Sequence, residues 1–201
     1  MNRRNFMKQS SLAAAGTFTA LSASRVWGAN ERLNVAVIGC GRMGQHNINV
    51  QQGTGMVDIT AVCDVYEPNL NAGLQRAGSG VQGYTDFRPI LDSKDVDAVV
   101  ISTPDHWHAL MTTLACDAGK DVFVEKPASV TIAEGRRMVE VARRTNRIVQ
   151  VGTMQRSSEV FQNTVKLIQN GALGDISFVR TWIMGNEHPQ GIGNPPDELP
   201  P

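Results

Sequence analysis

The sequence has few aromatic residues and no excess of either charge. Of its 201 residues 5% are aromatic, and 19 Lys and Arg balance 19 Asp and Glu. Proteins that bind nucleic acid usually carry a basic surface with aromatic side chains for stacking, so this composition argues against that class. A hydrophobic content of 41% argues against a disordered chain. The sequence also lacks a run of about 20 strongly apolar residues, which a membrane-spanning helix would need. These absences leave a globular domain as the class to consider.

Cysteine is also scarce. The three cysteines, Cys40, Cys63 and Cys116, form no CxxC pair and no evident disulfide framework. His106 and His108 are two residues apart, and side chains with that spacing do not converge on a helix. The sequence therefore predicts no metal site.

Residues 1–30 contain basic residues and no acidic ones. Arg3, Arg4 and Lys8 precede an uncharged stretch, residues 9–24, that is rich in Ala, Ser and Thr. That stretch is too weakly apolar to span a membrane, and the order of its parts is typical of an export signal. Adjacent arginines followed by Phe-Met-Lys resemble the twin-arginine signal. A basic terminus that contains Arg-Arg by chance is the alternative. We expect residues 1–30 to be a signal peptide and the protein to be exported to the periplasm.

Short apolar runs alternate with helical patterns along the rest of the chain. Strict alternation of this kind predicts right-handed crossovers and a Rossmann-type doubly wound parallel sheet, an α/β fold, over residues 31–152. Residues 153–201 are expected to begin a second α/β domain that is incomplete, since a lone strand and a Pro-rich tail end the chain. The predicted strands are 33–38, 57–63, 97–102, 121–124, 147–151 and about 176–184, and the predicted helices are 42–52, 67–77, a short 86–91, 104–119, 131–145 and 161–170.

Two helices carry more specific signals. Thr131 and Glu134 have the spacing of a capping box, which predicts that a helix begins between them. In the helix before it, apolar residues recur with helical periodicity and are expected to form the buried face. These are Trp107, Leu110, Met111, Leu114, Ala115 and Ala118.

A glycine-rich loop directly follows the first predicted strand. The sequence GCGRMG, residues 39–44, matches the dinucleotide-binding fingerprint, in which the glycines allow a tight turn, approach of a diphosphate and close helix packing. Asp64 ends the second strand, where a carboxylate binds the ribose hydroxyls of NAD and disfavours the 2′-phosphate of NADP. The alternative interpretation is that the glycines form an ordinary turn and that Asp64 is an acid exposed to solvent. The predicted NAD-binding residues here are Gly39, Gly41, Arg42, Met43, Gly44 and Asp64.

Two further motifs end later strands. Ser-Thr-Pro at residues 102–104 ends one strand, and Glu125-Lys126-Pro127 ends the next. The carboxyl ends of the strands form the ligand-binding edge of a doubly wound sheet. A lysine at that edge can polarise a hydroxyl or carbonyl group, or hold a ribose oxygen. A proline at a helix start and a solvated lysine are the ordinary alternatives, and the shared edge favours the functional interpretation.

Together, GCGRMG, Asp64, STPDHWH (102–108) and EKP (125–127) resemble in order and spacing the glucose–fructose oxidoreductase, inositol dehydrogenase and rhizopine-catabolism (Gfo/Idh/MocA) family. The resemblance covers residues 33 to about 185. It implies a cofactor site that includes Thr103, Pro104, His108, Glu125, Lys126 and Arg156, with Lys126 also reaching the substrate as the catalytic residue.

The resemblance also implies a substrate domain with an open, mostly antiparallel sheet that supplies a catalytic Asp and His, and the chain ends before that region. The expected function is NAD-dependent hydride transfer at a hydroxyl of a sugar, cyclitol or glycoside, by a homo-oligomer when full length. A redox-assisted glycosidase that uses NAD and a non-catalytic nucleotide- or sugar-binding protein are the alternatives. The sequence leaves the substrate open.

Overall fold

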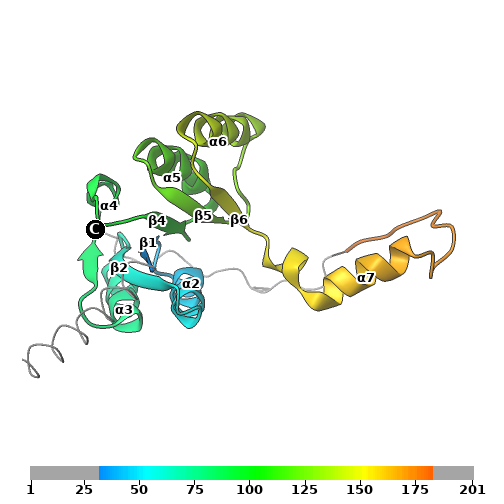
Figure 1. Ribbon diagram of the computed structural model, residues 1–201, viewed down its shortest axis with the longest axis horizontal. Helices are drawn as coiled ribbons and strands as arrows, with labels where there is room; N and C mark the ends of the chain where they lie inside the picture. Colours follow the sequence, from blue (N-terminus) through cyan, green and yellow to red (C-terminus); the bar gives the residue numbers. More distant parts are fainter. Residues whose placement is uncertain (1–31, 183–201) are drawn as a thin grey trace, which may run out of the picture. The chain divides into compact units, whose positions relative to one another are not determined.

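The computed structural model describes residues 32–182 (Figure 1). The chain divides into two compact units, one up to Val151 and one from Gly152 onward, which are described separately. The predicted signal peptide, residues 1–30, lies outside the described residues, as do the last two residues of the strand predicted at 176–184. Among residues 32–182 no helix combines the length and the hydropathy needed to cross a membrane.

A six-stranded sheet forms the centre of the first unit. The strand order is β3-β2-β1-β4-β5-β6, and the pairs β3–β2, β2–β1, β1–β4 and β4–β5 are parallel. The predicted doubly wound parallel sheet is therefore confirmed. The strands are β1 (Leu33–Ile38), β2 (Val57–Cys63), β3 (Gln82–Tyr84), β4 (Ala98–Ile101), β5 (Asp121–Glu125) and β6 (Val149–Gly152).

Helices cover both faces of the sheet because its strands are apolar on both sides. In β1, Val35 and Val37 pack with Ile48 of α2 on one face, whereas Ala36 and Ile38 pack with α4, α5 and α6 residues on the other. This alternation is the period of two expected for a strand buried on both faces. The helices are α2 (Arg42–Gly53), α3 (Glu67–Ala77), α4 (Arg88–Asp92), α5 (Asp105–Asp117) and α6 (Ile132–Thr145).

The capping box of α6 is confirmed. The Thr131 hydroxyl accepts a hydrogen bond from the Glu134 amide at 3.2 Å, and the Glu134 carboxylate accepts one from the Thr131 amide at 3.0 Å. These bonds satisfy backbone donors that the first helical turn otherwise leaves free. They also lower the pKa of Glu134, because the Thr131 and Val130 amides stabilise its charged form.

The buried face of α5 agrees with the prediction only in part, because Met111 and Ala115 are buried as expected and the other predicted residues are not. Trp107, Leu110 and Leu114 are 40–47% exposed. The buried residues of α5 are His108, Ala109, Met111, Thr112, Ala115 and Cys116. The small residues Ala109, Ala115 and Cys116 of this face pack in one core cluster with sheet residues and with α6. The prediction ranked residues by apolarity alone, and close packing selected a face that includes polar His108 and Thr112 instead.

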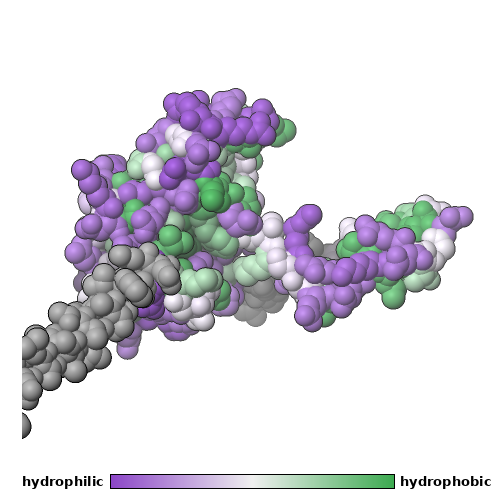
Figure 2. Space-filling model, in the orientation of Figure 1, coloured by the Kyte–Doolittle hydropathy of each residue, from purple (hydrophilic) through white to green (hydrophobic). Residues whose placement is uncertain are grey.

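The second unit contains a short 3₁₀ helix, η1 (Met154–Ser157), and helix α7 (Glu159–Gln169). The predicted apolar spacing in α7 is present, and Phe161, Val165 and Ile168 are exposed. Figure 2 shows hydrophobic and hydrophilic surface on this helix. The strand predicted at 176–184 is wrong over residues 176–182, which form no strand. A strand needs a neighbour for its backbone hydrogen bonds, and the described part of this unit offers none.

Candidate functional site

A cavity of about 760 Å³ opens at the carboxyl ends of β1, β2 and β4. The strand order reverses between β1 and β4, and α2 and α5, which follow these strands, pack on opposite faces. A doubly wound sheet binds ligands at such a switch point. Seven of the predicted site residues line this cavity: Gly39, Gly41, Arg42, Met43, Asp64, Thr103 and Pro104.

The glycine loop has the geometry that its sequence predicts. Gly39 has a φ of +90°, and a Cβ there would lie 2.6 Å from the Ser102 carbonyl oxygen. At Gly44 a Cβ would lie 1.8 Å from the Gly39 carbonyl oxygen, so only glycine lets α2 begin this close to β1. A Cβ at Gly41 meets only the Asn69 amide nitrogen, at 3.8 Å. Two glycines thus build the loop, and the third leaves its backbone open toward the cavity.

Asp64 connects the glycine loop to the end of β2. Its Oδ2 accepts a hydrogen bond from the Cys40 amide at 2.7 Å, and its Oδ1 accepts one from the Tyr66 amide at 2.9 Å. Each carboxylate oxygen has a second lone pair, so two hydroxyls can still be bound. The open backbone at Gly41 and this carboxylate on one cavity fit the diphosphate and ribose of a dinucleotide.

Several residues that line the cavity were not predicted from the sequence. Most follow β2 and β3 or lie on the first turns of α5: Val65, Asn69, Thr85, Asp86, Phe87, Arg88, Trp107 and Met111. The Asp86 carboxylate accepts a hydrogen bond from the Arg88 amide at 3.0 Å and forms a salt bridge with the Arg88 guanidinium at 3.4 Å. The cavity thus has two acids, Asp64 and Asp86, and two bases, Arg42 and Arg88. Had a strand been predicted at residues 82–84, the loop after it would have been expected at the same edge of the sheet as the other site residues.

Cys40 belongs to the glycine loop, Cys63 ends β2 beside the cavity, and both are buried. Burial raises the pKa of the Cys40 thiol to about 12, and the charge of Asp64 adds to the shift. The pKa of Cys63 is also raised to about 12, by burial and then by Cys40 and Asp64. Thiols with such pKa values stay protonated near neutral pH, so neither cysteine is a nucleophile of this site.

Glu125 and Lys126 lie at the end of β5 and do not line the cavity. The Glu125 carboxylate is buried, and its Oε1 accepts a hydrogen bond from the side-chain amide of Asn47 at 3.0 Å. The Lys126 side chain is exposed, and the Lys126–Pro127 peptide bond is cis. The acid of this motif is thus held inside the protein, whereas the lysine is free to meet a ligand.

His108 joins the two motifs at the sheet edge. The side chain is 1% exposed and does not line the cavity. Its Nε2 lies 2.8 Å from the Thr103 carbonyl oxygen, and its Nδ1 lies 2.6 Å from the Pro127 carbonyl oxygen. The ring therefore spans the turns after β4 and β5. His108 thus contacts both Thr103, which lines the cavity, and the segment that carries Lys126.

The other predicted site residues are placed as follows. Gly44 is buried in the first turn of α2 and packs against the loop rather than lining the cavity. Arg156 belongs to η1 in the second unit, so its predicted place in the cofactor site stays a prediction. Within residues 32–182 no three His, Cys, Asp or Glu side chains gather as a metal ion would require.

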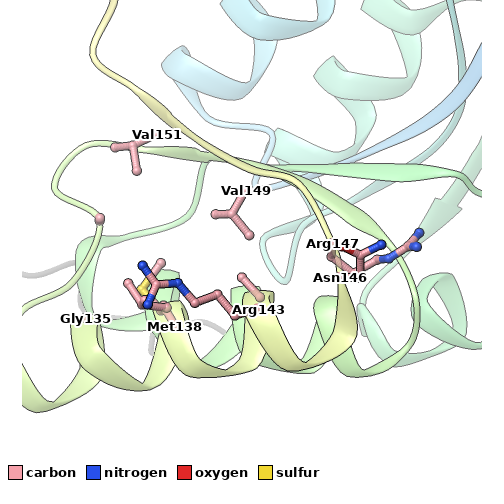
Figure 3. Close-up of a pocket in the computed structure, with 10 residues that line it drawn as sticks. Gly135, Met138, Arg143, Asn146, Arg147, Val149 and Val151 are labelled. Atoms are coloured by element: carbon pink, nitrogen blue, oxygen red, sulfur yellow. The ribbon is translucent and has the colours of Figure 1, made fainter.

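A second cavity of about 520 Å³ lies between α6 and β6 (Figure 3). Val149 and Val151 of β6 face Met138 of α6, with Arg143 and Arg147 along the helix end. The Arg147 guanidinium donates to the Gly119 carbonyl oxygen at 3.2 Å, so it is already engaged by the protein. None of the predicted site residues lines this cavity, and the cavity at the glycine loop remains the candidate site.

Sequence comparison finds dehydrogenase relatives. The Gfo/Idh/MocA family, described as an oxidoreductase family with an NAD-binding Rossmann fold, matches residues 33–153. Inositol 2-dehydrogenase of Klebsiella pneumoniae subsp. pneumoniae is 34% identical over 147 residues, which are 71% of this chain and 43% of that protein. The rhizopine catabolism protein MocA of Rhizobium meliloti is 30% identical over 148 residues, 74% of this chain and 46% of the relative.

Solved structures agree with these relatives. Scyllo-inositol dehydrogenase of Lactobacillus casei, with bound NAD(H) and scyllo-inositol, matches with a TM-score of 0.65 at 28% identity, covering 73% of this chain and 43% of that one. The chain thus spans less than half the length of the relatives it matches. The family match covers more than half of the chain and coincides with the sheet and its glycine loop. The chain therefore belongs to the Gfo/Idh/MocA oxidoreductase family, and it carries the family's NAD-binding Rossmann domain.

Proposed function

We propose that the complete protein is an NAD-dependent oxidoreductase that transfers hydride between the nicotinamide and a hydroxyl-bearing carbon of a sugar or cyclitol. The observation that carries this proposal is that His108 contacts both the turn that lines the dinucleotide cavity and the segment that carries Lys126. The glycine loop and Asp64 line the dinucleotide cavity, and His108 connects the Thr103 turn of that cavity to the Lys126–Pro127 segment. The inositol dehydrogenases among the relatives support a polyol as the substrate.

Different residues of the chain bind the cofactor and stabilise charge at the reacting oxygen. The glycine loop and Asp64 bind and orient the dinucleotide, whose nicotinamide supplies the hydride chemistry when it is bound. The Lys126 ammonium donates a hydrogen bond to the reacting oxygen and stabilises the negative charge that develops there as the proton leaves. Among residues 32–182 the Lys126 side chain contacts no proton-transfer partner, and we propose that a residue outside this range completes the transfer.

A cofactor assay tests this function directly. The complete protein is incubated with NAD⁺ and a panel of inositols, hexoses and glycosides, NADH absorbance is followed, and glycoside products are separated by chromatography. Absorbance that rises with an unglycosylated polyol supports the oxidoreductase. Cleaved glycoside without net NADH identifies the redox-assisted glycosidase. Dinucleotide binding with neither reaction identifies a non-catalytic binding protein.

Asp64 is expected to set the cofactor preference. We predict that NAD⁺ binds more tightly than NADP⁺, because the carboxylate repels a 2′-phosphate, and a contact of this kind is worth about 1–3 kcal/mol. Asp64→Ala is expected to narrow the preference rather than abolish binding. Since Asp64 also holds the Cys40 and Tyr66 amides, Asp64→Asn is the more conservative variant, removing the charge and keeping an acceptor. Calorimetry with both cofactors measures the effect.

An acidic residue outside the cavity provides the control for this experiment. Arg42 and Arg88 also line the cavity and attract phosphate, whereas Asp58 lies on β2 outside it. Asp58→Asn removes the same charge from the strand that Asp64 follows, and it is expected to leave the ratio of the NAD⁺ and NADP⁺ affinities unchanged. Equal or tighter binding of NADP⁺ by the unmodified protein would contradict the role given to Asp64 and would assign cofactor choice to the arginines.

We also propose export by the twin-arginine route, on the strength of the sequence of residues 1–30. A reporter fused after residue 30 is expected to reach the periplasm, and changing Arg3 and Arg4 to Lys is expected to stop it. The double substitution preserves charge, so a loss of export reports recognition of the arginine pair itself. Export that persists in the double variant would indicate the general secretory route.

A further inference from the structure

Asn47 lies in the interior of α2, where it contacts the ends of two strands. The side chain is 4% exposed. Its Nδ2 donates to the Ser102 hydroxyl at 2.9 Å and to Glu125 Oε1 at 3.0 Å. Ser102 follows β4 and Glu125 ends β5, so one amide group joins α2 to the edge of the sheet on which both site motifs lie.

The Glu125 carboxylate depends on this amide. Glu125 is also 4% exposed, and among the salt bridges of residues 32–182 none involves its carboxylate. Within the described part of the chain its other oxygen, Oε2, accepts a hydrogen bond only from the amide of Lys126, at 3.3 Å. A buried carboxylate without a cation needs hydrogen-bond donors to stay in place. Asn47 supplies the shorter of the two bonds, and it comes from the helix that begins at the glycine loop.

We infer that Asn47 is a positioning residue that holds the Glu125–Lys126 turn against α2 and thereby sets where the Lys126 ammonium meets the reacting oxygen. This inference rests on the proposed function for its catalytic consequence, whereas the holding of the turn follows from the contacts alone. Asn47 does not line the dinucleotide cavity, so it acts through Glu125 and not on the cofactor. The glycine loop and the Glu125–Lys126 turn are in this way connected through α2 and Asn47.

The test exchanges the amide for a carboxylate of the same shape. Asn47→Asp removes the donor and places a second acid about 3.0 Å from Glu125. Asn49→Asp is the matched control, since Asn49 lies on the same helix and is exposed. Amide hydrogen exchange of the segment 125–130 is expected to accelerate roughly tenfold in the first variant and to stay unchanged in the control. Asn47→Ala, which adds no charge, replaces the first variant if that one fails to fold.

Enzyme kinetics of Asn47→Asp and a second substitution that compensates for it provide two further measurements. In the complete protein Asn47→Asp is expected to lower kcat roughly tenfold with the Kd for NAD⁺ changed less than about threefold. The double variant Asn47→Asp/Glu125→Gln restores one amide and one carboxylate with their roles exchanged, and it is expected to return exchange in segment 125–130 toward the unmodified rate. Unchanged exchange in both Asn47 variants would overturn the inference, even if the protein is a dehydrogenase. Faster exchange in a protein that oxidises no polyol would instead contradict the proposed function alone.

Discussion

Lys126→Ala is expected to lower kcat/KM of the complete protein by roughly 10²-fold or more, a loss typical of a removed general acid–base group. The Lys126 side chain is exposed at the end of β5 and makes no side-chain hydrogen bond or salt bridge among the described residues, so its removal costs the fold little. NAD⁺ affinity should change far less, because the glycine loop and Asp64 are untouched. Steady-state kinetics and calorimetry on the same preparation measure the two quantities separately.

Lys94→Ala provides the control for that experiment. Lys94 is exposed between α4 and β4, away from the cavity, and its removal changes the net charge by the same amount. It is expected to leave both kcat/KM and NAD⁺ affinity as they are. A rate for Lys126→Ala equal to that of Lys94→Ala would make the EKP motif structural, and the oxidoreductase proposal would lose its catalytic residue.

Most of the fold could be predicted from sequence because its signals are local. The apolar runs at β1 and β2 are buried on both faces, and the glycine loop between β1 and α2 has few alternative conformations. The strand β3 was missed because Gln82-Gly83-Tyr84 is short, without β-branched residues, and lies at the sheet edge. Its pairing with Ala61–Cys63, far away in sequence, is what makes it a strand.

The candidate site was predicted less completely than the fold. Motifs such as GCGRMG can be identified by spacing, whereas Asn47 and His108 gain their roles from residues 78 and 19 positions away. Whether a polar residue of an amphipathic helix faces water or a strand end depends on how the helix is rotated against the sheet. In α5 that rotation buried His108 and left Leu110 exposed, contrary to the apolar pattern. Such roles become visible only when the strands are placed side by side.

Gly44 is where a single methyl group is expected to have its largest effect on stability. A Cβ at this position would lie 1.8 Å from the Gly39 carbonyl oxygen and 2.8 Å from its carbon. Both neighbours are backbone atoms of the tight turn after β1, so they cannot rotate away as a side chain could. Relief requires that α2 move off the sheet, which would also pull the Asn47 amide from Glu125.

Gly44→Ala is therefore expected to lower the free energy of unfolding by about 3 kcal/mol or more, at the upper end of the cost of overpacking. Gly53→Ala is the matched control, because it places the same methyl group on the same helix with nothing within 4 Å apart from the helix's own backbone and the neighbouring residues. There the change should be favourable, by up to about 1 kcal/mol, since alanine restricts the unfolded chain and favours the helix. Urea unfolding of the two variants measures the difference between them. Equal midpoints would mean that α2 can shift without cost, and the close approach of helix and strand at the glycine loop would then not be a requirement of this fold.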